Sequence, residues 1–403
     1  MNSPRRRQSK ARLTSSTIQR TAANYFKFVV TTIFIVDERG AGGLISPGPF
    51  PRGVLDEDDV AKVDRGGMRD IIASLPEQLE EGLRRGMGTH VDLQDAGHVF
   101  IAGMGGSGIA GDIFTAWVAD RSKVPIQVVR EYRLPSYAQS GDVLIAVSYS
   151  GNTEETLAAT SQAIKLGCAL LVVTSGGALA SLARETNAHL LEVPPGLPPR
   201  GAFGHLFGIL PGIGEDWVYG DLRGELRRTI VHLRELRSRY RPDAGLRSNR
   251  AKALAVRLRG RVPIVYGAPP FTAVAKRWQT QFNENAKVLA FASAFPEADH
   301  NELVGWCSDE TSRRFAPVML RDADETPEMR RRLDATAHLM GRYTKVERVE
   351  DDAPDLLGRM LGLLYLGDYV SLYLATLRKV DPRPVKPIEQ LKARLAGTRA
   401  GKS

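Results

Sequence analysis

The chain has 403 residues, of which 43% are hydrophobic and 25% are charged, and its formal net charge is +9. This length allows two domains with substantial cores, and the composition is that of a soluble globular protein rather than a disordered or fibrous one. The two cysteines, Cys168 and Cys307, exclude a disulfide framework and a zinc knuckle, and they fit a reducing, cytoplasmic setting.

The positive charge does not point to nucleic acid. Seven Lys or Arg residues and no acidic residue precede Asp37, so much of the excess lies at the N-terminus. The remaining basic residues are scattered over helical patterns beside glutamates, which is typical of a solvated helix face. Because the sequence has no recognition-helix or zinc-finger pattern, we expect no nucleic-acid partner.

Residues 1–54 differ in character from the rest of the chain. Residues 3–23 are basic and polar, and the apolar stretch 25–36 is too short to span a bilayer. A basic stretch before an apolar one is similar to a signal peptide, but charged residues stand where a small-residue cleavage site would be expected. We interpret 1–54 as an appended or disordered tail that ends in a Gly- and Pro-rich linker, 40–53.

The next part of the chain predicts an α/β fold. Apolar residues recur at helical spacing over 55–92, and from 97 to about 196 short apolar runs alternate with helical patterns. The runs predict strands at 98–103, 125–130, 143–149, 169–174 and 189–193. Since these strands are almost continuously apolar, they predict a doubly wound parallel sheet, which binds ligands at the carboxyl ends of its strands.

A glycine-dense turn, Gly103-Met-Gly-Gly-Ser-Gly108, follows the first predicted strand and precedes a helical pattern from Ile109 to Trp117. Backbone N–H groups and the positive end of a helix then converge, which predicts an anion seat. A plain tight turn is the simpler interpretation, but four glycines in six residues exceed what a turn requires. The turn also satisfies the dinucleotide pattern G-x-G-x-x-G, for which Glu131 could supply the acidic residue.

The strand at 143–149 leads into a second cluster of small polar residues. Ser148, Ser150 and Thr153 offer three hydroxyls just before a helix that opens with two glutamates. Hydroxyls at adjacent strand ends suit a small phosphomonoester, and such a site does not require the adenosine half of a dinucleotide. Thr153 also fits the N-cap position of that helix, a role compatible with ligand contact by the residues before it.

Together, Gly103-Met-Gly-Gly-Ser-Gly108 and Ser148-Tyr-Ser-Gly-Asn-Thr-Glu-Glu155 resemble a sugar isomerase (SIS) domain, and more narrowly the bifunctional phosphoglucose/phosphomannose isomerases. The resemblance covers roughly residues 55–397. It implies two tandem SIS-type domains with doubly wound parallel sheets and flanking helices, acting on a sugar phosphate. It assigns phosphate binding to Gly106, Ser107, Ser148, Ser150 and Thr153.

The second half repeats the α/β pattern. Its predicted elements are strands at 262–266, within 288–295, at 316–320 and at 345–349, and helices at about 271–285 and 327–340. We predict a first SIS domain over 55–214, a helical, arginine-rich connection over 215–260, and a second SIS-like domain over 261–403 that has lost its phosphate turn.

Near the end of the chain, residues 355–377 are apolar enough to be mistaken for a membrane span. Arg359 and Asp368 interrupt this stretch, so we predict a buried helix and no membrane partner.

Arg200 is the one cation of the segment Pro198-Pro-Arg-Gly-Ala-Phe-Gly204. From the residues alone it could be a surface arginine before a helix. The resemblance places it in the active site, where a fixed cation would stabilise an enediolate.

The segment Asn283-Glu-Asn-Ala-Lys287 also matches the family. Isomerising an aldose to a ketose moves a proton between C1 and C2, and one carboxylate beside a cis-enediol can take and return that proton. Glu284 is the candidate base, a role that needs a partly desolvated setting. From spacing alone, Glu284 and Lys287 could equally be a surface ion pair on one helix.

Ring opening needs a proton donor and acceptor near the ring oxygen, and histidine titrates in the physiological range. The resemblance gives this role to His300, contributed by the neighbouring subunit of a homodimer, together with Lys392 on a final helix from about Val385. Lys386 is the alternative lysine. Val385 itself stands where the family commonly has a polar side chain, which leaves the choice between glucose and mannose open.

The sequence therefore predicts a cytoplasmic, metal-free isomerase that interconverts glucose 6-phosphate and mannose 6-phosphate with fructose 6-phosphate through a cis-enediol. The other histidines, such as His205 and His338, have no partner at metal-ligand spacing, and we expect no cofactor. The alternatives are a non-catalytic phosphosugar sensor, which needs no base, an isomerase of another sugar phosphate, and a dinucleotide-dependent enzyme.

Overall fold

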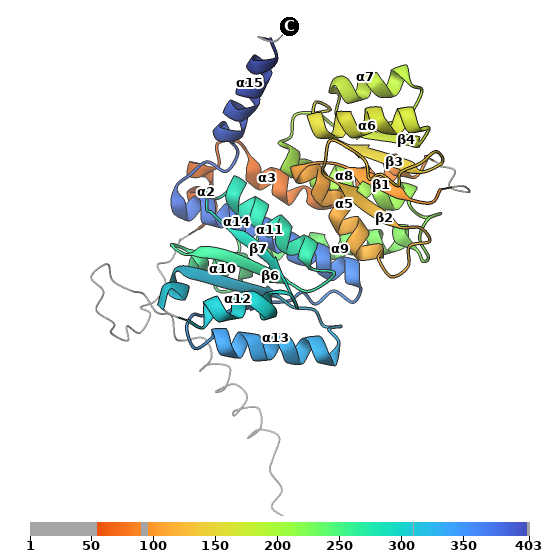
Figure 1. Ribbon diagram of the computed structural model, residues 1–403. Coiled ribbons are helices and arrows are strands. Elements are labelled where there is room, and N and C mark those ends of the chain that lie inside the picture. The colour runs from red at the N-terminus through yellow and green to blue at the C-terminus, as the bar shows by residue number, and fades with distance from the viewer. Residues whose placement is uncertain (1–54, 90–95, 309, 401–403) are drawn as a thin grey trace, which may run out of the picture. The chain divides into compact units, whose positions relative to one another are not determined.

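A computed structural model describes residues 55–89, 96–308 and 310–400 (Figure 1). The tail predicted for 1–54 lies outside the described residues. Within them, the two predicted sheets are present, one in each predicted domain; the domain boundaries themselves stay a prediction.

The first sheet has five parallel strands in the order β2-β1-β3-β4-β5. They are β1 (Val99–Ala102), β2 (Ile126–Val129), β3 (Val143–Val147), β4 (Ala169–Thr174) and β5 (His189–Glu192), which confirms the five predicted strands. In the register of the central pair, Ala102 lies opposite Ala146, so the loops after β1 and β3 leave the sheet side by side. The strand order reverses between these two strands, at the switch point where open α/β sheets bind ligands.

Helices cover both faces of this sheet (Figure 1). Phe100, Leu144 and Val172 face a core shared with α6 (Glu154–Leu166) and α7 (Gly177–Glu185). On the other face α5 (Gly105–Val118) lies so close to β1 that a Cβ at Gly111 would come within 2.9 Å of the Ile101 side chain.

The predicted helical stretch 55–92 forms α2 (Glu57–Val63), α3 (Met68–Ala73) and α4 (Leu75–Gly86). The α4 helix packs against α8 (Phe203–Ile213) with backbone against backbone, since glycines face each other along the contact. A Cβ added at Gly82 would lie 2.6 Å from the His205 carbonyl oxygen, and one at Gly208 would lie 2.5 Å from the Leu79 carbonyl oxygen. No other residue fits there without moving a helix.

Two amphipathic helices, α9 (Leu222–Tyr240) and α10 (Arg250–Leu258), connect the two sheets, as the sequence predicts for 215–260. Their N-caps are Asp221 and Asn249, whose side chains accept hydrogen bonds from backbone N–H groups of the first turn. Two arginines of α9, Arg234 and Arg237, form ion pairs with glutamates of α4, which balance part of the positive charge of this region.

The second sheet has four parallel strands in the order β7-β6-β8-β9. They are β6 (Val262–Gly267), β7 (Phe291–Ala294), β8 (Phe315–Leu320) and β9 (Glu347–Val349), accompanied by α11 (Thr272–Glu284), α12 (Ala298–Trp306) and α13 (Pro327–Met340). The predicted elements are confirmed. The end of α11 matters for the site described below: the helix ends at Glu284, so the residues after it are not helical.

The apolar stretch near the C-terminus forms α14 (Leu356–Arg378), which by length and composition alone could cross a membrane. In its most apolar window, 94% is buried inside the protein, as predicted for a core helix. The two charges that interrupt the apolar stretch are paired: Arg359 bonds to Asp322 and Asp324, and Asp368 bonds to Arg277. After a Pro-Arg-Pro segment, α15 (Lys386–Ala400) stands out from its neighbours in Figure 1.

Candidate active site

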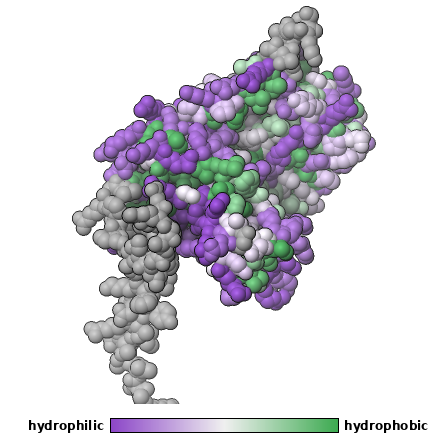
Figure 2. All heavy atoms as spheres, turned by 60° about the vertical axis from the view of Figure 1, so that its left-hand side comes forward, coloured by the Kyte–Doolittle hydropathy of each residue, from purple (hydrophilic) through white to green (hydrophobic). Residues whose placement is uncertain are grey.

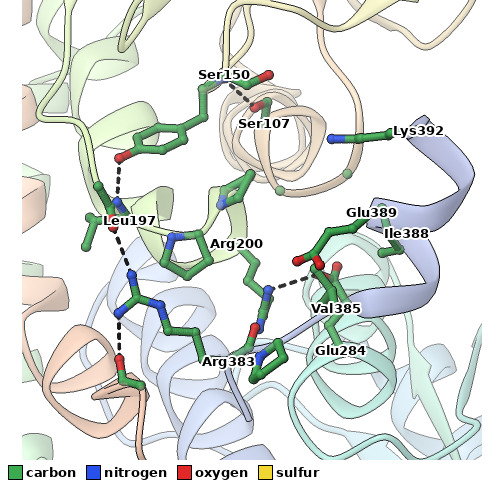
Figure 3. A pocket seen from close by; sticks show the side chains of 18 of the residues that line it. Ser107, Ser150, Leu197, Arg200, Glu284, Arg383, Val385, Ile388, Glu389 and Lys392 are labelled. Atoms are coloured by element: carbon green, nitrogen blue, oxygen red, sulfur yellow. Dashed lines mark hydrogen bonds and ion pairs between the residues drawn. The ribbon is translucent and has the colours of Figure 1, made fainter. Parts of the chain in front are cut away.

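A cavity of about 650 Å³ opens at the carboxyl ends of β1 and β3 (Figure 3). Both halves of the chain contribute to its walls. The first half supplies the turns after β1 and β3 and the segment 196–200, and the second half supplies the end of α11 and residues 381–392. The predicted ligand site therefore lies at the switch point of the first sheet, closed by elements of the second half.

The glycine turn is shaped by close contacts between chain segments. A Cβ at Gly106 would lie 2.9 Å from the Cα of Arg200 and from the carbonyl oxygen of Pro199. A Cβ at Gly108 would lie 2.5 Å from the Gly103 carbonyl oxygen. The glycines thus do more than make a turn, because they let the N-terminus of α5 sit directly against the arginine-bearing segment at the cavity.

The predicted hydroxyls take two different positions. Ser107, Ser150 and Thr153 line the cavity, and the Ser107 Oγ accepts a hydrogen bond from the Tyr149 N–H at 3.2 Å. Ser148 does not line it; this buried side chain lies behind Thr153, with the two hydroxyl oxygens 2.9 Å apart. Thr153 occupies the N-cap position of α6, but its side chain makes no capping bond and pairs with Ser148 instead.

Arg200 is only 2% exposed, which makes the interpretation as a surface arginine wrong. Its Nε donates to the Asn285 Oδ1 at 2.6 Å, and its Nη2 donates to the carbonyl oxygens of Pro382 and Arg383 at 2.8 and 2.9 Å. Its Nη1 donates to the Glu284 carboxylate at 3.2 Å. Burial lowers the pKa of Arg200, and the pairing with Glu284 opposes that shift.

A buried network behind Arg200 holds it in place. The Arg277 Nη2 donates to the Arg200 carbonyl oxygen at 2.9 Å and to Asp368 at 2.7 Å. Asn285, which binds the Arg200 side chain, donates in turn to the Ser371 Oγ at 2.9 Å. Main chain and side chain of the arginine are thus both fixed by α11, the residue after it and α14.

Glu284 is the last residue of α11, and its side chain is 27% exposed at the cavity beside Arg200 (Figure 3). The interpretation as a surface pair with Lys287 is wrong. Lys287 lies beyond the helix, with a φ of +54°, and its Nζ donates to the backbone carbonyl oxygen of Glu284 rather than to the carboxylate.

Lys392 extends from α15 into the cavity (Figure 3), whereas the alternative, Lys386, does not line it. Val385 and Ile388 form an apolar part of the same wall. Of the two lysines, Lys392 alone is placed to reach a ligand.

His300 does not line the cavity of its own chain. It is exposed on α12, while its sequence neighbours serve the fold: Asp299 accepts from the Thr336 hydroxyl, and Glu302 accepts from the hydroxyls of Tyr266 and Ser293. Within one chain the structure brings together all the predicted catalytic residues except this histidine.

Several cavity residues were not predicted from the sequence. Tyr149 donates its hydroxyl proton to the Pro194 carbonyl oxygen and accepts from the Leu197 N–H. Arg383 donates to the carbonyl oxygens of Gly66 and Gly196. Arg65, Asp381 and Glu389 also line the cavity. The Pro-Arg-Pro pattern around Arg383 is the one sequence signal for this set.

In the described part of the chain, one cluster of possible metal ligands forms away from the cavity wall: His232, Asp351 and Asp352. The His232 Nε2 lies 2.8 Å from the Asp351 carboxylate, and this hydrogen bond raises the pKa of the imidazole. The sequence reasoning considered metal-ligand spacing along the chain and did not find this cluster, because its members come from distant segments.

Parallel open sheets in tandem, with a glycine- and hydroxyl-lined cavity at a switch point, define an SIS-domain protein. The SIS domain family matches residues 92–196, and the bacterial phospho-glucose isomerase C-terminal SIS domain matches residues 247–395. A bifunctional phosphoglucose/phosphomannose isomerase of Caldicellulosiruptor bescii is 38% identical over 335 residues, which is 82% of this chain and 99% of that protein. The chain belongs to this isomerase family, which confirms the predicted resemblance.

Two further comparisons show how far the likeness extends. A D-glucosamine-6-phosphate 4-epimerase of Sulfolobus acidocaldarius is 30% identical, with 72% of this chain and 87% of that protein aligned. The solved structure of a hypothetical protein from Thermus thermophilus has a TM-score of 0.68 at 15% identity and covers 86% of this chain and 94% of that one. The structural likeness concerns the fold alone.

Proposed function

We propose that this chain interconverts glucose 6-phosphate and mannose 6-phosphate with fructose 6-phosphate. One observation carries the proposal beside the family membership: a buried arginine, Arg200, which donates four hydrogen bonds, holds the carboxylate of Glu284 at a cavity whose other wall bears three small hydroxyls. A seat for an anionic ester and a proton-transferring carboxylate in one cavity are the parts that an enediol mechanism requires.

The phosphate would bind at the end of the cavity formed by the first sheet. Ser107, Ser150 and Thr153 offer hydroxyl donors there, and the N-terminus of α5 adds backbone N–H groups and its positive dipole end. Gly106 allows this close approach, and Ser148 acts indirectly by orienting the Thr153 hydroxyl.

In the aldose-to-ketose direction, Glu284 takes the proton from C2 of the open-chain sugar. The electron pair of that bond forms the C1–C2 double bond of a cis-enediolate, and the carbonyl oxygen at C1 takes up negative charge. The O2 proton passes to O1, and Glu284 returns its proton to C1, which gives the ketose. Because Arg200 is held by four acceptors, it presents a fixed positive charge as the negative charge develops. No step needs a metal.

Ring opening would use Lys392 and a histidine. Since His300 is exposed and lies off its own cavity, we assign it to the cavity of a second copy in a homodimer. Exposed apolar side chains of the same half support a contact surface: Val304, four residues further along the same helix, is 73% exposed, and Phe291, which begins the edge strand β7, and Leu289, just before it, are also exposed. Figure 2 shows apolar patches interrupting the hydrophilic surface of one face. A cytoplasmic location accords with the two free cysteines.

The test is a turnover assay of the purified protein with fructose 6-phosphate, in which both aldose products are followed with and without EDTA. We expect both products and no effect of the chelator. Glucosamine 6-phosphate serves as the comparison substrate. Loss of activity with EDTA would contradict the metal-free mechanism, and no turnover with ligand binding intact would favour a phosphosugar sensor. Protection from heating by NAD(P) but not by fructose 6-phosphate would favour a dinucleotide enzyme.

A further inference from the structure

Lys287 is a cation of the active-site region that the proposed mechanism does not use. It follows Glu284 by three residues, just past the end of α11, in a left-handed backbone conformation that turns its half-buried side chain back toward the helix. Its Nζ donates to the Glu284 carbonyl oxygen and, at 3.0 Å, to the carbonyl oxygen of Pro382. One ammonium group therefore joins the end of α11 to a segment 95 residues further along the chain.

The carbonyl oxygen of Pro382 accepts hydrogen bonds from two different side chains. It accepts from Lys287 and also from the Arg200 Nη2 at 2.8 Å, so two cations meet on one oxygen. The residue lies in the Pro-Arg-Pro segment that leads directly into α15. Its two prolines have no N–H and a fixed φ, so this segment is held through its carbonyl groups, the Arg383 side chain and the Arg383 N–H, which donates to the Asp381 carboxylate at 3.0 Å.

The position of α15 depends on the Pro-Arg-Pro segment, residues 382–384, that precedes it. Ile388, Leu391 and Leu395 of the helix are well exposed, so little apolar packing holds it along its described length. Yet α15 carries Lys392, which lines the same cavity as Glu284 from a different element and extends toward the Ser107 end of it (Figure 3). Contacts at residues 382 and 383 must therefore set where Lys392 lies relative to Glu284.

We propose that Lys287 is a positioning residue: its ammonium group ties the end of α11 to the Pro-Arg-Pro segment before α15 and so sets the spacing between Glu284 and Lys392. The proposal rests on the proposed function for its kinetic meaning, but the tie itself is a property of the fold. A displacement of about 1 Å between reacting groups can cost about 100-fold in rate, so a tie of this kind matters for turnover.

The charge of Lys287 is sensitive to pH in an accessible range. Burial first, and the nearby charge of Arg200 second, lower the pKa of Lys287 to about 8, while Asp381 and Glu284 oppose the shift. From the C-terminal side, the Arg378 guanidinium donates to the Lys287 carbonyl oxygen at 3.3 Å. Above about pH 8 the ammonium loses its proton, which weakens its bonds to the two carbonyls.

The experiment compares Lys287→Met and Lys287→Arg with the wild type in the full-length protein. For Lys287→Met we expect kcat to fall about 10- to 100-fold. KM for fructose 6-phosphate should stay within about 3-fold, because the phosphate seat is untouched. For the wild type we expect activity to fall as pH rises through about 8. Lys287→Arg should restore much of kcat and should lack that fall.

Lys379→Met is the matched control. Lys379 also has a left-handed backbone, with a φ of +56°, but its side chain is exposed and does not line the cavity. The same substitution thus carries a similar backbone cost without the tie, and it should leave kcat and the pH profile unchanged. A Lys287→Met enzyme with wild-type kcat and the same alkaline limb would overturn the proposal.

A readout without turnover separates this proposal from the proposed function. Hydrogen exchange over residues 381–395 should quicken in Lys287→Met and stay as in the wild type in Lys379→Met. Unchanged exchange in Lys287→Met would refute the tie even if the protein turned over no sugar phosphate. If Lys287→Met does not fold, the pH profile and exchange of Lys287→Arg decide the matter, since arginine keeps its charge.

Discussion

The two sheets share a topology but use opposite ends of equivalent helices. In each, a central strand, β1 or β6, is flanked by two parallel neighbours and is followed by a helix, α5 or α11. After β1 comes a glycine turn that opens the α5 N-terminus to the cavity, whereas after β6 the turn contains Pro269 and Pro270, which have no N–H groups to offer.

The second sheet therefore contributes the C-terminal end of its helix instead. Glu284 is the last residue of α11, where the helix dipole is unfavourable to a carboxylate and a nearby cation is needed. Arg200, from the first half of the chain, supplies that cation. Under the proposed function, the two halves would divide the work: the first would bind the anionic ester and contribute Arg200, and the second would supply the base.

The Glu284→Gln variant tests this division of roles most directly. If α11 supplies the base, kcat should fall about 1,000-fold while KM for fructose 6-phosphate changes little, because general base catalysis commonly contributes factors of this size. Steady-state kinetics measures both. Glu185→Gln is the control, since Glu185 is an exposed last residue of α7 in the other half. A kcat within 10-fold of the wild type would remove Glu284 from the role of base.

The second prediction concerns Glu284 and His300. Both belong to the second half of the chain, but at one active site they would come from different subunits. Mixing Glu284→Gln with His300→Ala subunits should recover activity from two nearly inactive parents. Half of the randomly mixed dimers contain both variants, and each of these has one intact site if His300 crosses the interface, which gives about a quarter of wild-type activity. No recovery after subunit exchange would place His300 in its own chain or outside the reaction.

The smallest effect is expected on the phosphate side. Ser150→Ala should raise KM for fructose 6-phosphate about 10-fold, the value of one hydrogen bond to a charged group, and leave kcat nearly unchanged. Ser161→Ala, on the outer face of α6, is the control because its hydroxyl bonds only within that helix. A fall in kcat with an unchanged KM would contradict the assignment of binding to the first half.

Much of this division could be predicted from local patterns. The glycine turn, the hydroxyls after β3 and the strand alternation are short-range signals. The five strands form as predicted, and Ser150 and Thr153 line the cavity, whereas Ser148 does not. The distinction between Ser148 and Ser150 could not be predicted, since two residues of one type at a strand end differ only in which way they face. The end of α11 was predicted to within one residue, whereas the alternative that pairs Glu284 with Lys287 on one helix was wrong because Lys287 lies beyond that end.

The supporting contacts were beyond sequence reasoning for a different reason. Arg383 binds a carbonyl 317 residues away, and Arg277 binds Asp368 across 91 residues. Such pairs depend on how whole elements pack, and no local pattern indicates which residue either arginine will bind. His300 is exposed away from the cavity of its own chain, and the role proposed for it depends on association between copies, which no local pattern encodes.

The glycine-faced contact between α4 and α8 has a consequence for how this protein can change. Because α8 begins three residues after Arg200, a methyl group at Gly82 or Gly208 would push on the segment that carries the guanidinium. Mutational tolerance should then be low along the contact between α4 and α8, although neither helix lines the cavity. A survey of all single substitutions should find this contact as intolerant of substitution as the cavity itself.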